Sequence, residues 1–344
     1  MKVGVLISRS GPAGLWGPST EACAIMAASE INAVGGIRGT EMQILIADPG
    51  WNDINAAAVA SDLVEVEGVD AIVGMHPSNV RQVIKDHLAG RVPYYYTPHY
   101  EGDERDPNTI AIGGTDSVLM SRCLPWFVEE RRARRFCLLA NDYVWPHRAI
   151  ETAGRIIAES GGRVVSELTI PFRENYDQSI DTIRRLRPDV VVMFLLGEEM
   201  VKFNRAFAEA GLADTIMRFG LGVDENVLMG IGAESTPNLY AATTFTPSFK
   251  SFCNEHFMEL YHRSFGEFAP SVSVFGQSCY EGIHLAGAVA RHVGAYSGRR
   301  TAQFVSRLRR DSVRHLLPRS KFVEESRVHF VQADGIGFNL IRTH

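Results

Sequence analysis

The chain has 344 residues, of which 45% are hydrophobic and 22% charged, and its formal net charge is -5 with a sequence pI near 6.1. This composition is typical of a globular protein, and the length suffices for two domains that each bury a core. The acidic balance excludes a basic surface for nucleic acid as an organising feature. The basic run EERRARR at 129–135 follows acids and is interpreted as the solvated end of a helix.

The first residues, MKVGVLISRSGP, hold an apolar run too short for the hydrophobic region of a secretory signal. No stretch reaches the ~18 apolar residues of a membrane span. The sequence as written predicts a cytoplasmic protein, and the alternative is a periplasmic or extracytoplasmic lipoprotein whose signal has been removed. Five cysteines are spread through apolar contexts without a C-x-x-C pair, which indicates reduced, packed thiols. They are Cys23, Cys123, Cys137, Cys253 and Cys279.

Short apolar runs alternate with amphipathic stretches along the chain, as in βαβ units. The predicted strands are 2–8, 42–48, 69–74 and 109–114, then 134–141, 162–170, 189–196 and 215–222. The predicted helices are 19–36, 52–68 and 78–90, then 147–160, 176–186 and 198–210. Residues 248–310 are mostly helical in pattern, and the end of the chain predicts a hairpin that turns near Asp334–Gly335.

Continuous apolar strands of this kind are buried on both faces, as in parallel sheets that helices cover. The count predicts an α/β protein of two doubly wound, three-layer lobes. We expect residues 1–116 and 248–318 to form lobe one, and residues 117–247 and 319–344 to form lobe two. Doubly wound sheets bind ligands outside the carboxyl ends of their strands. A cleft between two such lobes can close on a small molecule.

Catalysis and nucleotide binding have little support. GGIRG at 35–39 lies between a helix and a strand, the reverse of a phosphate-binding order, and G-x-x-x-x-G-K-[ST] does not occur. His76 and His99 have no carboxylate or nucleophile placed beside them by local spacing. We therefore expect no enzyme, no catalytic residues, no cofactor and no metal.

Two aromatic turns and one serine mark the loops after predicted strands. VPYYYTPHYEG at 92–102 and NDYVWPH at 141–147 both place tyrosines beside a proline, and we predict that they form two walls of one pocket. Ser78 is predicted at a helix N-cap, where its hydroxyl would either cap the helix or bind a ligand oxygen. Tyr94 and Tyr95 are expected to point into the core.

The order of elements and these loops resemble the branched-chain amino-acid-binding (Leu/Ile/Val-binding) type of periplasmic binding protein, type I fold, across nearly the whole chain. The motifs Y-x-x-x-Y-E-G at 96–102 and D-Y-x-x-P at 142–146 resemble the branch with the short-chain amide receptor of amidase operons and the urea-binding proteins. The S-x-x-G opening at 8–11 and the G-x-x-x-S spacing at 74–78 agree with this branch.

The resemblance implies a binding protein that holds a small amide or urea without catalysis. By motif position, Ser78, Tyr96 and Pro98 would contact the ligand from lobe one, and Tyr143 and Trp145 from lobe two. An amide needs a hydroxyl or N–H donor on one side and carbonyl or phenol oxygens on the other.

Three residues differ from what the resemblance to the amide- and urea-binding branch would lead us to expect, or leave the ligand class open. Trp145 stands where the amide receptor has a second tyrosine, and an indole N–H only donates. His76 stands where a tyrosine is expected. Asp224 lies in a loop where amino-acid-binding relatives place an acidic partner for the ligand ammonium. If Asp224 faces the ligand, an amino acid fits the site; if it caps the following helix, which we favour, the ligand is neutral.

Three functions follow from the sequence. The leading one is a ligand sensor that negatively regulates an amide- or nitrile-degradation operon through an antiterminator-type regulator protein. The alternative is the substrate-binding component of an ABC importer for urea, amides or amino acids, with a permease as its partner. The third is an enzyme that acts on a small amide. No helix-turn-helix precedes Val3, so we expect no direct nucleic-acid binding, and a homodimer is left open.

Overall fold

In the computed structural model, residues 1–293, 300–301, 304 and 328–344 are described. The chain divides into two compact units. Unit 1 comprises Met1–His99, Asp103–Gly113 and the described part of Lys250–Glu325, and unit 2 comprises Tyr100–Gly102, Gly114–Phe249 and the described part of Ser326–His344. Tyr100–Gly102, which the sequence analysis included in lobe one, thus lies with unit 2.

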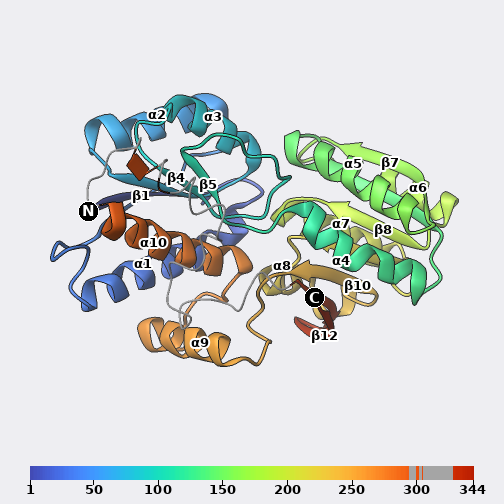
Figure 1. Ribbon diagram of the computed structural model, residues 1–344. Helices are drawn as coiled ribbons and strands as arrows, with labels where there is room; N and C mark the ends of the chain where they lie inside the picture. The colour runs from blue at the N-terminus through green and yellow to red at the C-terminus, as the bar shows by residue number, and fades with distance from the viewer. Residues whose placement is uncertain (294–299, 302–303, 305–327) are drawn as a thin grey trace. The chain divides into compact units, whose positions relative to one another are not determined.

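Unit 1 is built on a five-stranded parallel sheet that helices cover on both faces. Its strand order is β2-β1-β3-β4-β5. The strands are β1 (Lys2–Ile7), β2 (Gln43–Ala47), β3 (Ala71–Met75), β4 (Tyr94–Tyr96) and β5 (Thr109–Ala111). Figure 1 shows α1 (Gly17–Ala33) beside α10 (Val274–Val293) on one face, and α2 (Asp53–Ser61) with α3 (Ser78–Leu88) on the other. The remaining helices of this unit are η1 (Gly14–Trp16), η2 (Asp62–Val66) and α9 (Phe252–Phe265).

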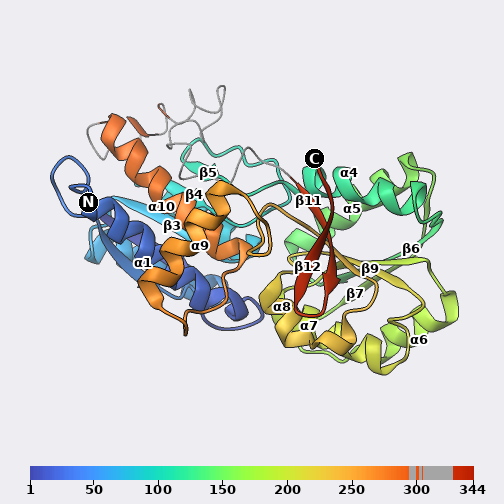
Figure 2. The same cartoon turned by 90° about the horizontal axis from the view of Figure 1, so that it is seen from below.

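Unit 2 is built on a seven-stranded mixed sheet with the order β12-β11-β10-β9-β8-β6-β7. The strands are β6 (Arg135–Asn141), β7 (Arg163–Ile170), β8 (Val190–Phe194), β9 (Met217–Leu221), β10 (Leu239–Thr243), β11 (His329–Asp334) and β12 (Gly337–Thr343). Helices α4 (Asp116–Glu129) and α5 (Val144–Glu159) cover one face, while α6 (Asp177–Leu186), α7 (Gly197–Glu209) and α8 (Glu225–Ile231) cover the other (Figure 2). The short η3 (Ala233–Ser235) follows α8.

The predicted fold, two α/β lobes with helices on both sheet faces, is confirmed. The C-terminal hairpin turns at Gly335, whose φ of +61° is a backbone conformation that glycine adopts without strain. It adds two antiparallel strands to unit 2, so this sheet is mixed and not wholly parallel. α4 and β10 were not predicted, and β4 and α8 were indicated only by the loops beside them. The predicted helical region at 248–310 extends into residues outside the described part of the chain.

The parallel strands of each unit are apolar on both faces, which is why they form the centre of three layers. All five residues of β3 and all five of β8 are buried. Among the helices that the structure describes, none is both long and apolar enough to cross a lipid bilayer.

Candidate ligand-binding site

The candidate residues of unit 1 lie where β3 and β4 end. Parallel strands place their carboxyl ends at one edge of the sheet, so the loops that follow them gather there. His76 and Pro77 come directly after β3, and Thr97 and Pro98 directly after β4. The Thr97 N–H and hydroxyl both donate to the Gly74 carbonyl, at 3.0 and 3.1 Å, which ties the two loops together.

His76 is a neutral, internally bonded side chain. Its Nδ1 lies 3.2 Å from the Pro77 carbonyl, which can only accept, so Nδ1 carries the proton and Nε2 accepts from the Tyr94 hydroxyl at 2.9 Å. The side chain is buried, and burial lowers the pKa of His76 to about 4. A Cβ on Gly74 would lie 2.5 Å from His76 Nε2, so only glycine leaves room for the ring. His76 therefore shapes the loop as an uncharged group.

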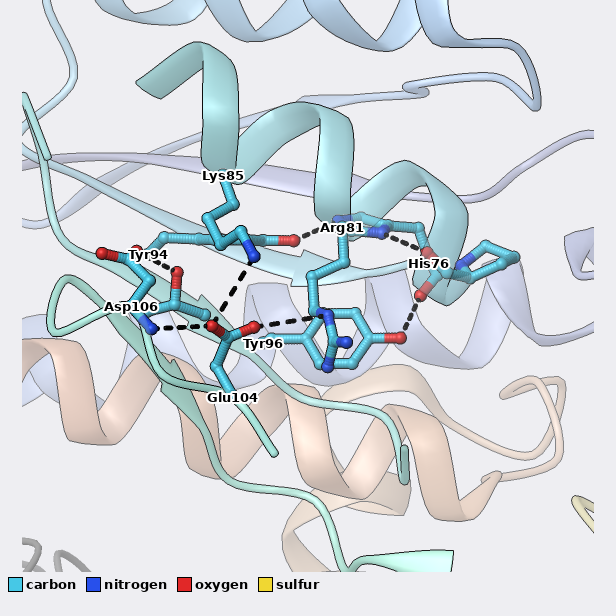
Figure 3. Close-up of polar contacts among 9 residues, drawn as sticks. His76, Arg81, Lys85, Tyr94, Tyr96, Glu104 and Asp106 are labelled. Atoms are coloured by element: carbon cyan, nitrogen blue, oxygen red, sulfur yellow. Dashed lines mark hydrogen bonds and ion pairs between the residues drawn. The ribbon is translucent and has the colours of Figure 1, made fainter. Parts of the chain in front are cut away.

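Tyr96 is held in a buried polar network behind this loop (Figure 3). Its hydroxyl donates to the His76 carbonyl at 2.8 Å, and the Arg81 guanidinium lies 4.9 Å from the centre of its ring. Glu104 lies between two cations of α3, at 3.7 Å from Arg81 Nε and 3.8 Å from Lys85 Nζ. The phenol that the sequence predicted as a ligand contact thus fixes the backbone that leads into α3. Tyr94 and Tyr95 are buried as expected.

The prediction that Ser78 is an N-cap is wrong. Ser78 is the first residue of α3, and the N-cap position belongs to Pro77, whose side chain makes no cap bond. The cause is the fixed φ of proline, which is -65° here and leads directly into a helix. The first N–H groups of an α-helix have no partner within the helix, and a helix of 11 residues carries a positive partial charge at that end. Ser78 is buried at this helix end.

Pro98 is buried where the β4 loop crosses the segment after β5. A Cβ built on Gly113 would lie 1.9 Å from the Pro98 carbonyl oxygen, so the two backbones approach as closely as only glycine allows. This close approach fixes the turn after Tyr96. It also explains why Gly113 is a glycine, which the sequence alone did not show.

In unit 2, Tyr143 and Trp145 follow β6 at the carboxyl edge of the second sheet. Tyr143 is the half-buried N-cap residue of α5, with its ring centre 5.5 Å from that of Phe172. Trp145 is buried, and its indole Nε1 donates to Asp116 Oδ2 at 2.7 Å. The ring centres of Tyr143 and Trp145 are 6.1 Å apart. The structure therefore brings the two aromatic side chains of this turn together.

Asp224 caps α8, as favoured from the sequence. Its Oδ1 accepts from the Val227 N–H at 3.1 Å, and the side chain is buried. The next residue, Glu225, is buried as well and accepts hydrogen bonds from the Thr246 and Ser248 hydroxyls. Burial raises the pKa of Glu225 to about 7, since no cation among the described residues compensates its charge.

Several residues of this arrangement were not identified from the sequence. The supporting residues are far in sequence from the motif residues that they contact, so sequence spacing could not predict these contacts. They are Arg81, Glu104 and Asp116. A weak signal existed for Arg81, which follows Ser78 by three residues and therefore lies on the same face of α3. Thr246 lies after β10, a strand that the sequence analysis did not predict.

The groups at these sheet edges are helix N-termini, hydroxyls and aromatic rings. Within the described residues no group of three or more His, Cys, Asp or Glu side chains could hold a metal ion. Four of the five thiols, those of Cys23, Cys123, Cys137 and Cys279, are buried. Helix N-termini, a serine and aromatic rings can instead hold an oxygen-bearing small molecule.

Comparison with known proteins identifies the family and the fold. Residues 1–333 match the periplasmic binding protein family. A solute-binding protein of an ABC transporter from R. palustris, solved in complex with 4-hydroxybenzoate, is 16% identical with a TM-score of 0.84, and the match covers 100% of this chain and 96% of that one. The branched-chain amino acid transporter substrate binding protein of Streptococcus pneumoniae, in complex with isoleucine, is 18% identical with a TM-score of 0.80, covering 100% and 98%. An ABC transporter substrate-binding protein from Sphaerobacter thermophilus is 19% identical with a TM-score of 0.80, covering 100% and 97%.

These likenesses extend over essentially the whole length of both partners in each comparison, and at these identities they establish the fold. The amide- and urea-binding branch is not among these structures. The family match over residues 1–333 and the two α/β units agree with one another, and the chain belongs to the periplasmic binding protein family, with its type I fold.

Proposed function

We propose that the chain is the extracytoplasmic ligand-binding component of an ABC importer, and that it takes a small molecule through an amide or carboxylate oxygen. The importer role is supported by the solved relatives, which are described as ABC transporter binding proteins. This is the alternative from the sequence analysis. The importer role replaces the sensor of an amide operon as our leading proposal. With this role, we expect the protein outside the cytoplasmic membrane and not in the cytoplasm.

The observation that carries the ligand class is the N-terminus of α3. Pro77 gives it no side-chain cap, and Ser78 adds a hydroxyl there. Such a helix end favours an oxygen that accepts hydrogen bonds, whether from an amide or a carboxylate. In unit 2, the Asp224 carboxylate is engaged in capping α8, which favours a ligand without an ammonium group. In unit 1, the loops after β3 and β4 are shaped by His76, Tyr96 and Pro98. In unit 2, the candidate aromatic contacts are Tyr143 and Trp145.

A thermal-shift screen tests the ligand class, because a ligand that binds only the folded state raises the melting temperature. The panel contains acetamide, propionamide, urea, acetate, benzoate, and aliphatic and acidic amino acids. We expect amides or simple carboxylates to raise the melting temperature and the amino acids to leave it unchanged. A shift with amino acids alone would contradict the proposed class and would make Asp224 an ammonium partner.

A second candidate, the amide sensor, keeps one specific observation in its favour. The motifs at 96–102 and 142–146 resemble those of the amide receptor branch. Affinity purification of the tagged chain from its native cells, with and without acetamide, separates the two roles. Recovery of a permease supports the importer, whereas recovery of an RNA-binding regulator that acetamide releases would establish the sensor.

A further inference from the structure

A tryptophan outside every motif discussed so far lies at the same edge of the unit 1 sheet. Trp51 is in the loop between β2 and α2, next to the loops that follow β1 and β3 in the strand order β2-β1-β3. It is half-buried, whereas Trp16 and Trp145 are buried. Its indole is a large, flat side chain that is only partly covered by the rest of the unit.

The loop that carries Trp51 is rigidly tied to its neighbours. Ser10 Oγ donates to Asp48 Oδ2 at 2.7 Å, and the Gly50 N–H donates to Asp48 Oδ1 at 2.9 Å. Asn55 Nδ2 donates to the Pro49 carbonyl at 3.0 Å. A side chain on a loop so fixed is held in place before any ligand arrives, which lowers the entropy cost of a contact.

Trp51 also contacts both neighbouring loops. Asn79 Nδ2, from the first turn of α3, donates to the Trp51 carbonyl at 3.3 Å. A Cβ on Gly11, in the β1 loop, would lie 3.9 Å from Trp51 Cε3, an ordinary van der Waals distance. The Trp51 backbone is therefore tied to the start of α3, and its indole lies beside the loop after β1.

Three buried polar atoms on these two loops have no hydrogen-bond partner among the described residues. They are Ser8 Oγ, Trp16 Nε1 and Asn79 Oδ1. Ser8 and Trp16 are only 1% and 2% exposed. Buried polar atoms are nearly always paired, so three orphans at one sheet edge indicate a bound partner with both donors and acceptors.

We propose that Trp51 is a specificity-determining ligand contact, and that the ligand joins its amide or carboxylate to a flat apolar group such as a phenyl ring. The ring stacks on the Trp51 indole, while Ser8 and Asn79 bond to polar atoms of the ligand. This inference rests on the proposed function and narrows it to ligands larger than acetamide or urea.

Calorimetric titrations of the full chain with acetamide, benzamide, acetate and benzoate test the proposal. In the wild type we expect benzamide to bind at least about ten-fold more tightly than acetamide, or benzoate at least about ten-fold more tightly than acetate. The Trp51→Ala variant should lose this preference for the ring. Trp51→Phe should retain most of it, because phenylalanine also stacks. Val66→Ala is the matched control, since Val66 is a 76% exposed apolar side chain at the opposite, amino edge of the same sheet, and it should change nothing.

The outcomes of these titrations distinguish the Trp51 contact from the proposed ligand class. If Trp51→Ala keeps the ring preference while its melting temperature and circular dichroism match the wild type, Trp51 is not a contact. If acetamide or acetate binds and neither ring-bearing ligand does, the inference is wrong while the proposed function stands. If none of the four binds, the inference is wrong, and the full thermal-shift panel decides whether the proposed ligand class stands. A quenching of tryptophan fluorescence by benzamide that disappears in Trp51→Phe would support a direct contact independently of affinity.

Discussion

At the scale of single residues, the side chains predicted as ligand contacts are engaged in hydrogen bonds within the fold. The Tyr96 hydroxyl holds the His76 carbonyl, and the Trp145 indole holds Asp116. Both are therefore positioning groups as well as candidate walls. A loss of affinity on removing either one would reflect a displaced loop as much as a lost contact.

Trp145→Phe separates these contributions. The phenyl ring keeps most of the apolar surface but leaves Asp116 Oδ2 without its indole donor. We expect the free energy of unfolding to fall by about 1–3 kcal/mol, the range for a buried polar group that loses a hydrogen-bond partner. Urea denaturation measures it, with Trp126→Phe as a control because Trp126 is half-buried and packs through ring contacts, at 5.3 Å from Phe127. An unchanged stability in Trp145→Phe would show that the indole bond contributes nothing.

Glu225 makes the stability of unit 2 depend on pH. Its carboxyl is protonated more readily in the folded chain, with a pKa raised by burial to about 7 from 4.5. The folded state therefore binds more protons than the unfolded state between these values, and the contribution of Glu225 declines as pH rises from about 4.5 to about 7. The loss is at most roughly 3 kcal/mol, from about 1.4 kcal/mol for each pKa unit.

The measurement is a series of urea denaturation curves from pH 5 to 8 for the wild type and Glu225→Gln. The glutamine cannot ionise, so the variant should lack this decline and be relatively more stable at pH 8. Between about pH 4 and 6.5, His76 provides the opposite slope in both proteins: burial lowers its pKa to about 4, so its contribution is lost as pH falls through 6.5 towards 4. Identical pH profiles for both proteins would contradict the burial of an ionisable Glu225.

At the scale of elements, α3 of unit 1 and α8 of unit 2 differ at their N-termini. α3 begins without a side-chain cap after Pro77, whereas α8 is capped by Asp224. The sequence predicted both helices, yet it misplaced the cap of α3 by one residue because a proline N-cap has no side-chain acceptor. The N-terminus of α3 thus has no side-chain cap from its N-cap residue, whereas that of α8 is capped by its own chain.

Asp224→Asn and Asp224→Ala distinguish a cap from an ammonium partner. Asparagine retains the oxygen that accepts from Val227, so it should preserve stability, whereas alanine should lower the free energy of unfolding by about 1 kcal/mol. Ligand affinity for an amide should be unchanged in Asp224→Asn, as measured by calorimetry. A loss of affinity of ten-fold or more in the asparagine variant, at unchanged stability, would show that the carboxylate charge serves the ligand.

At the scale of the whole molecule, the alternation of apolar runs was sufficient to predict two α/β units, because buried parallel strands have an unmistakable composition. It was not sufficient for α4, whose helix contains Pro125, or for β10, a short strand in a threonine-rich segment. The motifs located the loops after β3, β4, β6 and β9. Their supporting partners, Arg81, Glu104 and Asp116, are visible only in three dimensions, since they come from other segments of the chain. Trp51 lies in no sequence motif. Its position next to α3 becomes visible only once the strand order of the unit 1 sheet is known.

A ligand oxygen at the N-terminus of α3 is tested by a calorimetric titration of the wild type and Ser78→Ala with the ligand that gives the largest thermal shift. We expect saturable binding of one ligand per chain to the wild type. The affinity should be about 3- to 10-fold lower for Ser78→Ala, which corresponds to a hydrogen bond worth about 0.5–1.5 kcal/mol. Equal affinities for the two proteins would contradict a ligand oxygen at the N-terminus of α3, and ammonia release from an amide during the titration would contradict a binding protein.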